Sequence, residues 1–388
     1  MGTVRNILFI MCDQLRWDYL SCTGHPTLQT PNIDRLAKMG MRFDKCFVQS
    51  PVCGPSRASF YTGRTVFSHG ATWNFVPLPI GEMTLGDYLA PKGVRTAVAG
   101  KTHFRADTDG MARLGLTRDT DVGLRVSEGG FEPWERDDGE HPDPIVSPSL
   151  PYNAFLRSHG YEGDNPWNEY ANAAEGPNGE ILSGWHLRNS HLPARVKEEH
   201  SETAYITNRA MDFMRVAGDK PWLMHLSYIK PHWPYMAPAP YHALYKKSDM
   251  LPRVAERSEL NAPHPVYEAF SKMDAAQAFA REETRETVVP TYMGLVKQID
   301  DHVGRVLDML EETGLIKNTM VVFTSDHGDY LGDHWLGEKE LFHEPSVRVP
   351  LIIYDPDARS DKTRGTICDK LVEAIDLVPT FIDAHDMD

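Results

Sequence analysis

The stretch NILFIMCD, residues 6–13, is an apolar run of buried-strand length that ends on a carboxylate. Such a run is typical of a strand covered on both faces, as strands in parallel sheets are. Thr30 and Pro31 then favour a helix start, with Thr as N-cap and Pro at the first helical position, and Gly40 favours its end. The opening of the chain therefore predicts a strand, a loop and a helix.

The same alternation continues to the end of the chain. Further buried-strand patterns occupy residues 41–48, 96–100, 222–229, 320–324 and 349–354. Helical periodicity occupies residues 203–216 and 293–310. Strands that alternate with helices predict an α/β fold, with a large, mostly parallel or mixed central sheet sandwiched by helices.

We expect a single domain over residues 1–388, because this length suits one large α/β core with insertions. Residues 107–200 are rich in Gly, Pro, Asp, Glu and Trp and show little periodicity, which favours a long insertion or lid near the site. Residues 255–288 suggest a second, smaller excursion.

Composition and charge exclude several classes of protein. Five cysteines in 388 residues argue against a disulfide scaffold, and the formal net charge of −15 argues against nucleic acid and anionic membranes as partners. No stretch approaches the roughly 20 apolar residues that span a bilayer. The apolar run at residues 7–11 is too short for a signal peptide, so we expect a cytoplasmic protein.

Charged and polar side chains follow four of the predicted strands. In open α/β sheets, ligands bind beyond the carboxyl ends of the strands. Four strands that end in such residues predict a site at this edge. The residues are Asp13, Lys101, His103, Lys230, His232, Asp326 and His327.

The segment CGPSRASFYTGR, residues 53–64, reads as a turn that runs into a helix. Pro55 suits a first helical turn, so Cys53 is expected at a helix N-terminus, where the dipole and free amides favour an anion. Arg57 follows one turn later and can reach back to a negative centre. On this local pattern alone, a redox cysteine of low pKa is an equally good interpretation.

The pattern Cys-x-Pro-Ser-Arg-x-x-x-x-Thr-Gly-Arg resembles the signature of the sulfatase family, which also includes the phosphonate monoester hydrolases. The resemblance extends over nearly the whole chain, through TPNIDRLA at residues 30–37, TSDHGDYLGDH at residues 324–334 and RVPLII at residues 348–353. It implies the alkaline phosphatase-like sulfatase fold and oxidation of Cys53 to formylglycine. Family members usually continue into a small C-terminal subdomain, which we expect to be missing or truncated here.

The resemblance also implies one divalent metal ion. Asp13, Asp326 and His327 match the metal positions of the family, and the group derived from Cys53 completes the ligand set. Oxygen-rich ligation suits Ca²⁺ first, with Mn²⁺ or Mg²⁺ as alternatives. Gln14 and His327 replace the Asp and Asn of many sulfatases, as in the phosphonate monoester hydrolase branch, and this makes Mn²⁺ a serious alternative to Ca²⁺. Helix capping is the structural alternative for the two aspartates.

By the same resemblance, the hydrated aldehyde attacks sulfur or phosphorus, and the resulting hemiacetal ester then collapses without attack by water. Arg57 would orient the nucleophile, and Lys101 and His103 would contact the nucleophile and the anionic group. Lys101 and His103 are similar to the residues that sulfatases carry at these positions, whereas a phosphonate monoester hydrolase is expected to carry neutral polar residues there.

Three further residues are candidate substrate contacts. His232 and Lys339 match substrate-contacting positions, and either could protonate the leaving oxygen. The alternative is that Lys339 is an ordinary surface lysine and that His232 is an ordinary hydrogen-bonded histidine. Asn74, in WNF at residues 73–75, is a weaker candidate, because an asparagine in a turn explains it as well.

Three functions remain open at this point. The first is hydrolysis of an aryl or small organic sulfate ester, and the second is hydrolysis of phosphonate monoesters or phosphate diesters at the same site. The third is a non-catalytic metal-binding protein with unmodified Cys53. The expected partners are a small anionic ester, an enzyme that generates formylglycine and, in a homo-oligomer, further copies of the chain.

Overall fold

The computed structural model describes residues 4–139, 150–261 and 263–386. Its centre is an eight-stranded sheet of order β10-β2-β9-β8-β1-β7-β3-β4, in which β9 alone runs antiparallel to its neighbours. The predicted large, mostly parallel sheet is thereby confirmed. The strands are β1 (Asn6–Asp13), β2 (Met41–Phe47), β3 (Arg95–Gly100), β4 (Glu132–Arg136), β7 (Trp222–Pro231), β8 (Thr319–Ser325), β9 (Arg348–Tyr354) and β10 (Thr366–Glu373).

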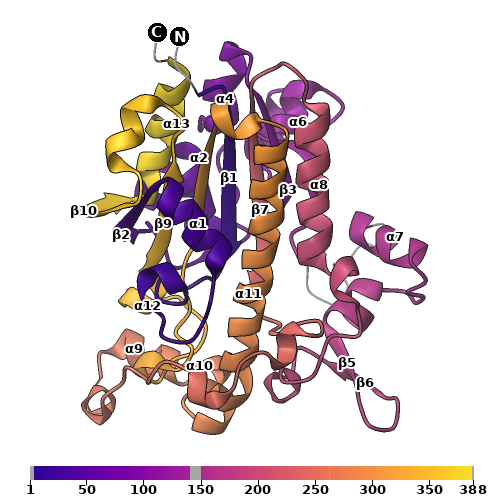
Figure 1. Cartoon of the computed structure of the whole chain (residues 1–388), viewed down its shortest axis with the longest axis vertical. Helices are drawn as coiled ribbons and strands as arrows, with labels where there is room; N and C mark the ends of the chain where they lie inside the picture. Colours follow the sequence, from indigo (N-terminus) through magenta and orange to yellow (C-terminus); the bar gives the residue numbers. More distant parts are fainter. Residues whose placement is uncertain (1–3, 140–149, 262, 387–388) are drawn as a thin grey trace.

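Helices cover both faces of the sheet (Figure 1). Leu8, Ile10 and Cys12 of β1 pack toward one face, under α1 (Pro31–Met39), α8 (Glu202–Val216) and α11 (Glu282–Glu312). Ile7, Phe9 and Met11 pack toward the other, under α2 (Cys53–Thr62), α4 (Leu85–Leu89) and α13 (Leu377–Asp386). This alternation explains why the whole strand is apolar, since each side chain of β1 enters one of two cores.

Two local predictions differ from the structure. The predicted helix at residues 293–310 begins at Glu282 and passes through Pro290, and buried residues continue from Val288 along its length, so packing outweighs the local cost of proline. Thr30 precedes α1 but makes no side-chain capping bond. The Asp300 carboxylate of α11 instead accepts the amides of Asn32 and Ile33.

The excursion predicted at residues 255–288 contains two short helices, α9 (Pro265–Ser271) and α10 (Asp274–Phe279). Its predicted end lies inside α11, which begins six residues earlier, at Glu282. Residue 262 lies outside the described residues. His334 donates its amide to Val254 O and joins the start of this region to the segment that follows β8. Figure 1 shows α9 and α10 together at the lower end of the molecule.

The segment predicted as an insertion, residues 107–200, is divided between the sheet and its edge. Its strand β4 extends the central sheet beside β3, while residues 140–149 lie outside the described residues. Its role as a lid stays a prediction. The other elements of this segment include α5 (Thr108–Arg113), α6 (Asp121–Ser127), α7 (Pro151–Ser158), a π-helical turn (Trp167–Ala171) and the hairpin β5 (Ala173–Glu175) with β6 (Ile181–Ser183).

In the part of the chain that the structure describes, the remaining short α-helices are α3 (Val66–His69) and α12 (Glu344–Val347). Among the residues that the structure describes, no helix combines the length and apolar character needed to cross a membrane.

Candidate active site

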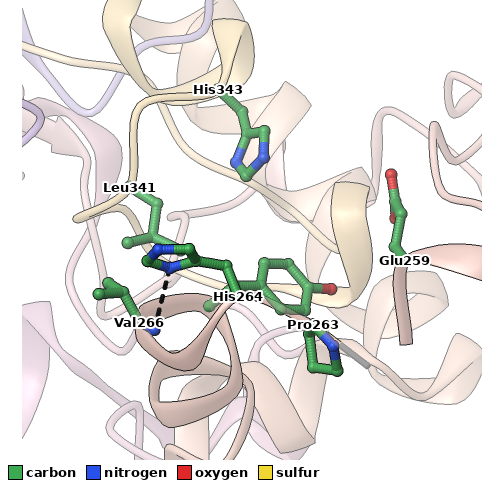
Figure 2. Close-up of a pocket in the computed structure, with 7 residues that line it drawn as sticks. Glu259, Pro263, His264, Val266, Leu341 and His343 are labelled. Carbon is green, nitrogen blue, oxygen red and sulfur yellow. Dashed lines mark hydrogen bonds between the residues drawn. The ribbon is translucent and has the colours of Figure 1, made fainter. Parts of the chain in front are cut away.

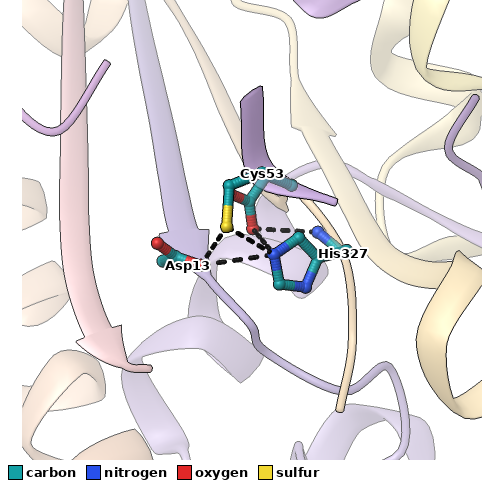
Figure 3. Close-up of side chains that lie close together, drawn as sticks. Asp13, Cys53 and His327 are labelled. Atoms are coloured by element: carbon teal, nitrogen blue, oxygen red, sulfur yellow. Dashed lines mark hydrogen bonds and ion pairs between the residues drawn. The ribbon is translucent and has the colours of Figure 1, made fainter. Parts of the chain in front are cut away.

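Four predicted side chains meet at the carboxyl edge of the sheet. Asp13 is the last residue of β1, and Asp326 and His327 follow the neighbouring strand β8. Cys53 is the first residue of α2, as its sequence predicts. One ligand atom from each of the four lies within 4.8 Å of the others, and all four side chains are buried. Figure 3 shows Asp13, Cys53 and His327 converging from separate elements.

The His327 imidazole has one nitrogen free to face this cluster. Its Nδ1 lies 2.8 Å from Gly328 O, an acceptor, so Nδ1 carries the proton of the neutral ring. Its Nε2 lies 3.0 Å from Cys53 Sγ and 3.5 Å from Asp13 Oδ1. A backbone carbonyl that fixes the tautomer in this way is common behind a histidine that binds metal.

The charges of the cluster favour a cation at its centre. Burial alone would lower the pKa of His327, but Asp326 and Cys53 outweigh burial and raise it to about 9. The cluster therefore attracts positive charge between its two carboxylates and the sulfur. Two carboxylates, one imidazole nitrogen and the position of Cys53 Sγ, which stands where a formylglycine oxygen would lie, suit a divalent ion.

Arg57 is fully buried one turn along α2. Its Nε donates to Asp326 Oδ2 at 2.8 Å, and its Nη1 donates to Lys101 O at 2.7 Å and Ser227 Oγ at 2.8 Å. The guanidinium thus orients one carboxylate and neutralises part of its charge. These hydrogen bonds place Arg57 beside Asp326, and its role in orienting the nucleophile stays a prediction.

Two lysines supply positive charge close to Cys53. Lys101 follows β3 and its ammonium contacts Asp13, while Lys339 Nζ donates to Gln14 Oε1 at 2.7 Å. Burial alone would raise the pKa of the Cys53 thiol, but Lys339, Lys101 and His327 hold it well below its usual value. The site is therefore built to stabilise negative charge at position 53.

His232 and Asn74 join the site from loops. The Nε2 of His232 accepts a bond of 2.8 Å from Lys339 Nζ, so these two candidates for leaving-group protonation lie side by side. Asn74 Oδ1 accepts the Gly54 amide at 2.8 Å. A Cβ on residue 54 would meet that oxygen at 2.9 Å, which gives Gly54 a reason to be glycine. Asn74 therefore ties its loop to the residue that follows Cys53.

The sequence profile of the sulfatase family matches residues 5–387 of this chain. The chain belongs to the sulfatase family. Among its relatives is the multifunctional alkaline phosphatase superfamily protein PehA of Trinickia caryophylli, 33% identical over 404 residues, which cover 98% of this chain and 74% of that protein. An arylsulfatase of Clostridium perfringens is 27% identical over 401 residues, covering 98% of this chain and 75% of its own.

Solved structures of family members have the same fold. A phosphonate monoester hydrolase from Silicibacter pomeroyi superposes with a TM-score of 0.82 at 27% identity, over 98% of this chain and 73% of its own. The enzyme of the same name from Agrobacterium radiobacter gives a TM-score of 0.81 at 25% identity, over 98% and 74%. The predicted sulfatase-type fold is thereby confirmed.

The sequence did not predict the network around Gln14 in this sulfatase-family site. Gln14 Nε2 donates to Asp329 Oδ2 at 2.6 Å, and the Tyr235 hydroxyl donates to the same oxygen at 2.7 Å. Gln14 also has a φ of 67°, a left-handed conformation that non-glycine residues adopt at some cost. Tyr235 lies three residues after His232, and this proximity is the one sequence signal that pointed to it.

A shallow apolar hollow lies beyond Lys339, away from the cluster. Figure 2 shows it between α9 and the chain that follows Lys339, and none of the predicted site residues lines it. Its lining residues are Glu259, Pro263, His264, Val266, Tyr267, Leu341 and His343. We assign it no part in the chemistry.

Proposed function

We propose that this protein hydrolyses a sulfate ester and that Cys53, oxidised to formylglycine, provides the nucleophile. The observation that carries the proposal is the placement of Cys53 Sγ within 4.8 Å of ligand atoms from Asp13, Asp326 and His327 at a helix N-terminus. Family membership supports a hydrolase that acts on sulfate esters.

A divalent ion held by Asp13, Asp326 and His327 would supply Lewis acidity beside position 53. Ca²⁺ is the first choice, and the imidazole ligand keeps Mn²⁺ and Mg²⁺ as alternatives. Formylglycine would supply a hydroxyl nucleophile whose ester breaks down without attack by water. Arg57 orients Asp326 through the bond of 2.8 Å, and Lys101 and Lys339 offset negative charge around position 53.

Protonation of the leaving oxygen falls to the pair of His232 and Lys339. In the described geometry, Lys339 Nζ donates to His232 Nε2, so a proton can pass between the two side chains without either one moving far. The His232 Nδ1 contacts the carbonyl of Trp233, which orients the ring. We propose that Asn74 and these two side chains contact the substrate.

Hydrolysis of phosphonate monoesters or phosphate diesters at the same site is the second candidate. The two phosphonate monoester hydrolases, with TM-scores above 0.8, favour it, as do Gln14 and His327. Lys101 and His103 favour sulfate, because a phosphonate monoester hydrolase is expected to carry neutral polar residues there. One site can serve both reactions, so we propose sulfate esters as the preferred class with promiscuity toward the second.

An apolar rim beside His103 favours an aryl or other small organic leaving group. Phe75 is 66% exposed and Trp73 51% exposed, and the Phe75 ring lies 5.8 Å from that of His103. Trp17 stacks on the Arg348 guanidinium, and Trp233 packs edge-on against Trp185. We therefore expect the leaving group to contact the loop of residues 73–75.

The proposal requires an enzyme that converts Cys53 to formylglycine, and it leaves the cytoplasmic location and a homo-oligomeric assembly as predictions. Mass spectrometry of the peptide that contains Cys53 tests the modification, with an aldehyde expected in place of the thiol. Purified protein should then hydrolyse aryl sulfates faster than aryl phosphonates, with Cys53→Ala as the inactive reference. A thiol at position 53 together with no hydrolysis would instead support a non-catalytic metal-binding protein.

A further inference from the structure

His103 has an unusual backbone for a site residue. Its φ is 48°, in the left-handed region that non-glycine residues adopt only at an energetic cost. Such a conformation persists only where the surroundings hold it. His103 lies two residues after Lys101, whose ammonium contacts Asp13, so the turn at position 103 lies beside the reaction centre.

The Asp138 carboxylate holds this backbone from one side. Its Oδ1 accepts the Thr102 amide at 2.8 Å and the His103 amide at 3.0 Å. This one oxygen therefore holds the backbone at residues 102 and 103 in the turn that His103 adopts. Asp138 lies in the segment of residues 107–200, for which the sequence predicted no site residue.

Arg136 completes the clamp from the other side. Its Nε donates to Asp138 Oδ2 at 2.9 Å, and its Nη2 donates to the carbonyl of Phe104 at 2.8 Å. The pair therefore contacts the backbone on both sides of His103. Glu128 Oε2 in turn accepts from Arg136 Nη1 at 2.6 Å and limits the movement of the guanidinium.

The charges show that this carboxylate is built to remain ionised. Burial alone would raise the pKa of Asp138, but Arg136 and the His103 amide hold it at about 2. The adjacent Asp137 shows the opposite behaviour, because burial and the neighbouring Glu202 raise its pKa well above the usual value. Of the two neighbouring carboxylates, Asp138 is the one with a fixed charge and a full set of partners.

We propose that Asp138, held by Arg136, is a positioning residue that keeps the His103 imidazole directed at position 53. The inference rests on the proposed function, in which His103 contacts the nucleophile and the anionic group. Asp138 touches no reacting atom in this arrangement and acts only through the turn of residues 102–104.

The test is a double-mutant cycle with Asp138→Ala and His103→Ala, measured as kcat/KM on an aryl sulfate. Asp138→Ala should lower kcat/KM about 10- to 100-fold, because small displacements of catalytic groups have effects of this size. In the His103→Ala background, the same change should cost less than about twofold, since His103 is the group through which it acts. Asp138→Asn keeps an acceptor oxygen and should recover part of the loss.

Asp300→Ala is the matched control. Asp300 is also a buried carboxylate that accepts two consecutive amides, those of Asn32 and Ile33, but it lies between α1 and α11. The Asp300→Ala variant should lose thermal stability without a change in kcat/KM per folded molecule. If Asp138→Ala lowers kcat/KM by the same factor in the wild-type and the His103→Ala backgrounds, Asp138 is not a positioning residue for His103.

A second readout separates this inference from the proposed function. Labelling of His103 by diethyl pyrocarbonate, followed by mass spectrometry, needs no hydrolysis. The buried Nδ1 of His103 should become more reactive in Asp138→Ala by about threefold or more and remain unchanged in Asp300→Ala. If labelling of His103 is unchanged in Asp138→Ala, the inference is wrong. If the wild-type protein is inactive but Asp138→Ala still increases labelling of His103, only the proposed function is wrong.

Discussion

The centre of the site and its rim are held in different ways. The centre consists of Asp13, Cys53, Asp326 and His327, whose side chains are at most 1% exposed. Its strands are hydrogen-bonded neighbours, with Cys12 opposite Ser325, so sheet register sets the distance between the two carboxylates. The rim residues Asn74, His103 and His232 come from loops and are partly exposed.

This difference indicates a division of work. A buried centre set by sheet register tolerates little change, because each group depends on the same close contacts. Loop residues that are not part of the sheet can change without disturbing it. We therefore expect substitutions at the centre to remove activity and substitutions at the rim to alter which ester is preferred.

The largest effect is expected from Asp326→Asn. The change removes one anionic ligand and the nearer of the two charged partners of the buried Arg57, so bound metal and hydrolysis should both fall, the rate by about 10³-fold or more. Asp333→Asn is the matched control, because Asp333 is also buried and pairs with an arginine, Arg16, at 2.8 Å. Metal content by atomic emission and initial rates test this. Full metal content with wild-type rates would contradict the assignment of Asp326.

A medium effect is expected from Lys101→Asn combined with His103→Thr. Both changes remove groups that can stabilise charge on the transferring group and leaving oxygen. The ratio of kcat/KM for aryl sulfate to that for aryl phosphonate should fall about 10- to 100-fold. The same substitutions at Lys297 and His302 of α11 serve as control, since those residues pair with Asp301 and Glu198. If the ratio of the two kcat/KM values is unchanged, residues other than Lys101 and His103 determine the substrate preference.

The smallest effect is expected from Phe75→Ala. The ring would lose contact with the leaving group, and one aromatic contact contributes about 0.5–1.5 kcal/mol, so kcat/KM for aryl sulfates should fall about 3- to 10-fold. Esters of small alkyl alcohols should be unaffected. Phe67→Ala removes a phenylalanine that is 98% exposed, and it should change kcat/KM for neither aryl sulfates nor alkyl esters. A loss of the same size on alkyl esters would show that Phe75 acts on His103 instead.

Much of the centre could be predicted from the sequence because parallel strands finish at one edge. Asp13 and Asp326 each end a buried apolar run, and two such runs in one parallel sheet bring their carboxylates together. The helix start at Cys53 also follows from local rules, since Gly54 and Pro55 suit that position. These signals lie within a few residues of the side chains concerned.

The rest depended on contacts between distant parts of the chain. Pro290 lies inside α11, where packing against the sheet outweighs the local preference to end a helix. Asp300 caps α1 from 267 or more positions away, where the sequence predicted Thr30. Arg57 faces Asp326, and Asp138 holds His103, although neither partner lies near the other in sequence.

The sequence by itself determined the alternation of strands and helices, the polar groups at the strand ends and the signature around Cys53. Each of these is a local pattern that the periodicity or the chemistry of neighbouring residues reveals. Only the tertiary structure decided which charge meets which: Lys101 with Asp13, Arg57 with Asp326 and Lys339 with His232. The reason is physical, because a buried charge is stabilised by whatever partner the packed fold brings within reach, and that distance is unrelated to separation along the chain.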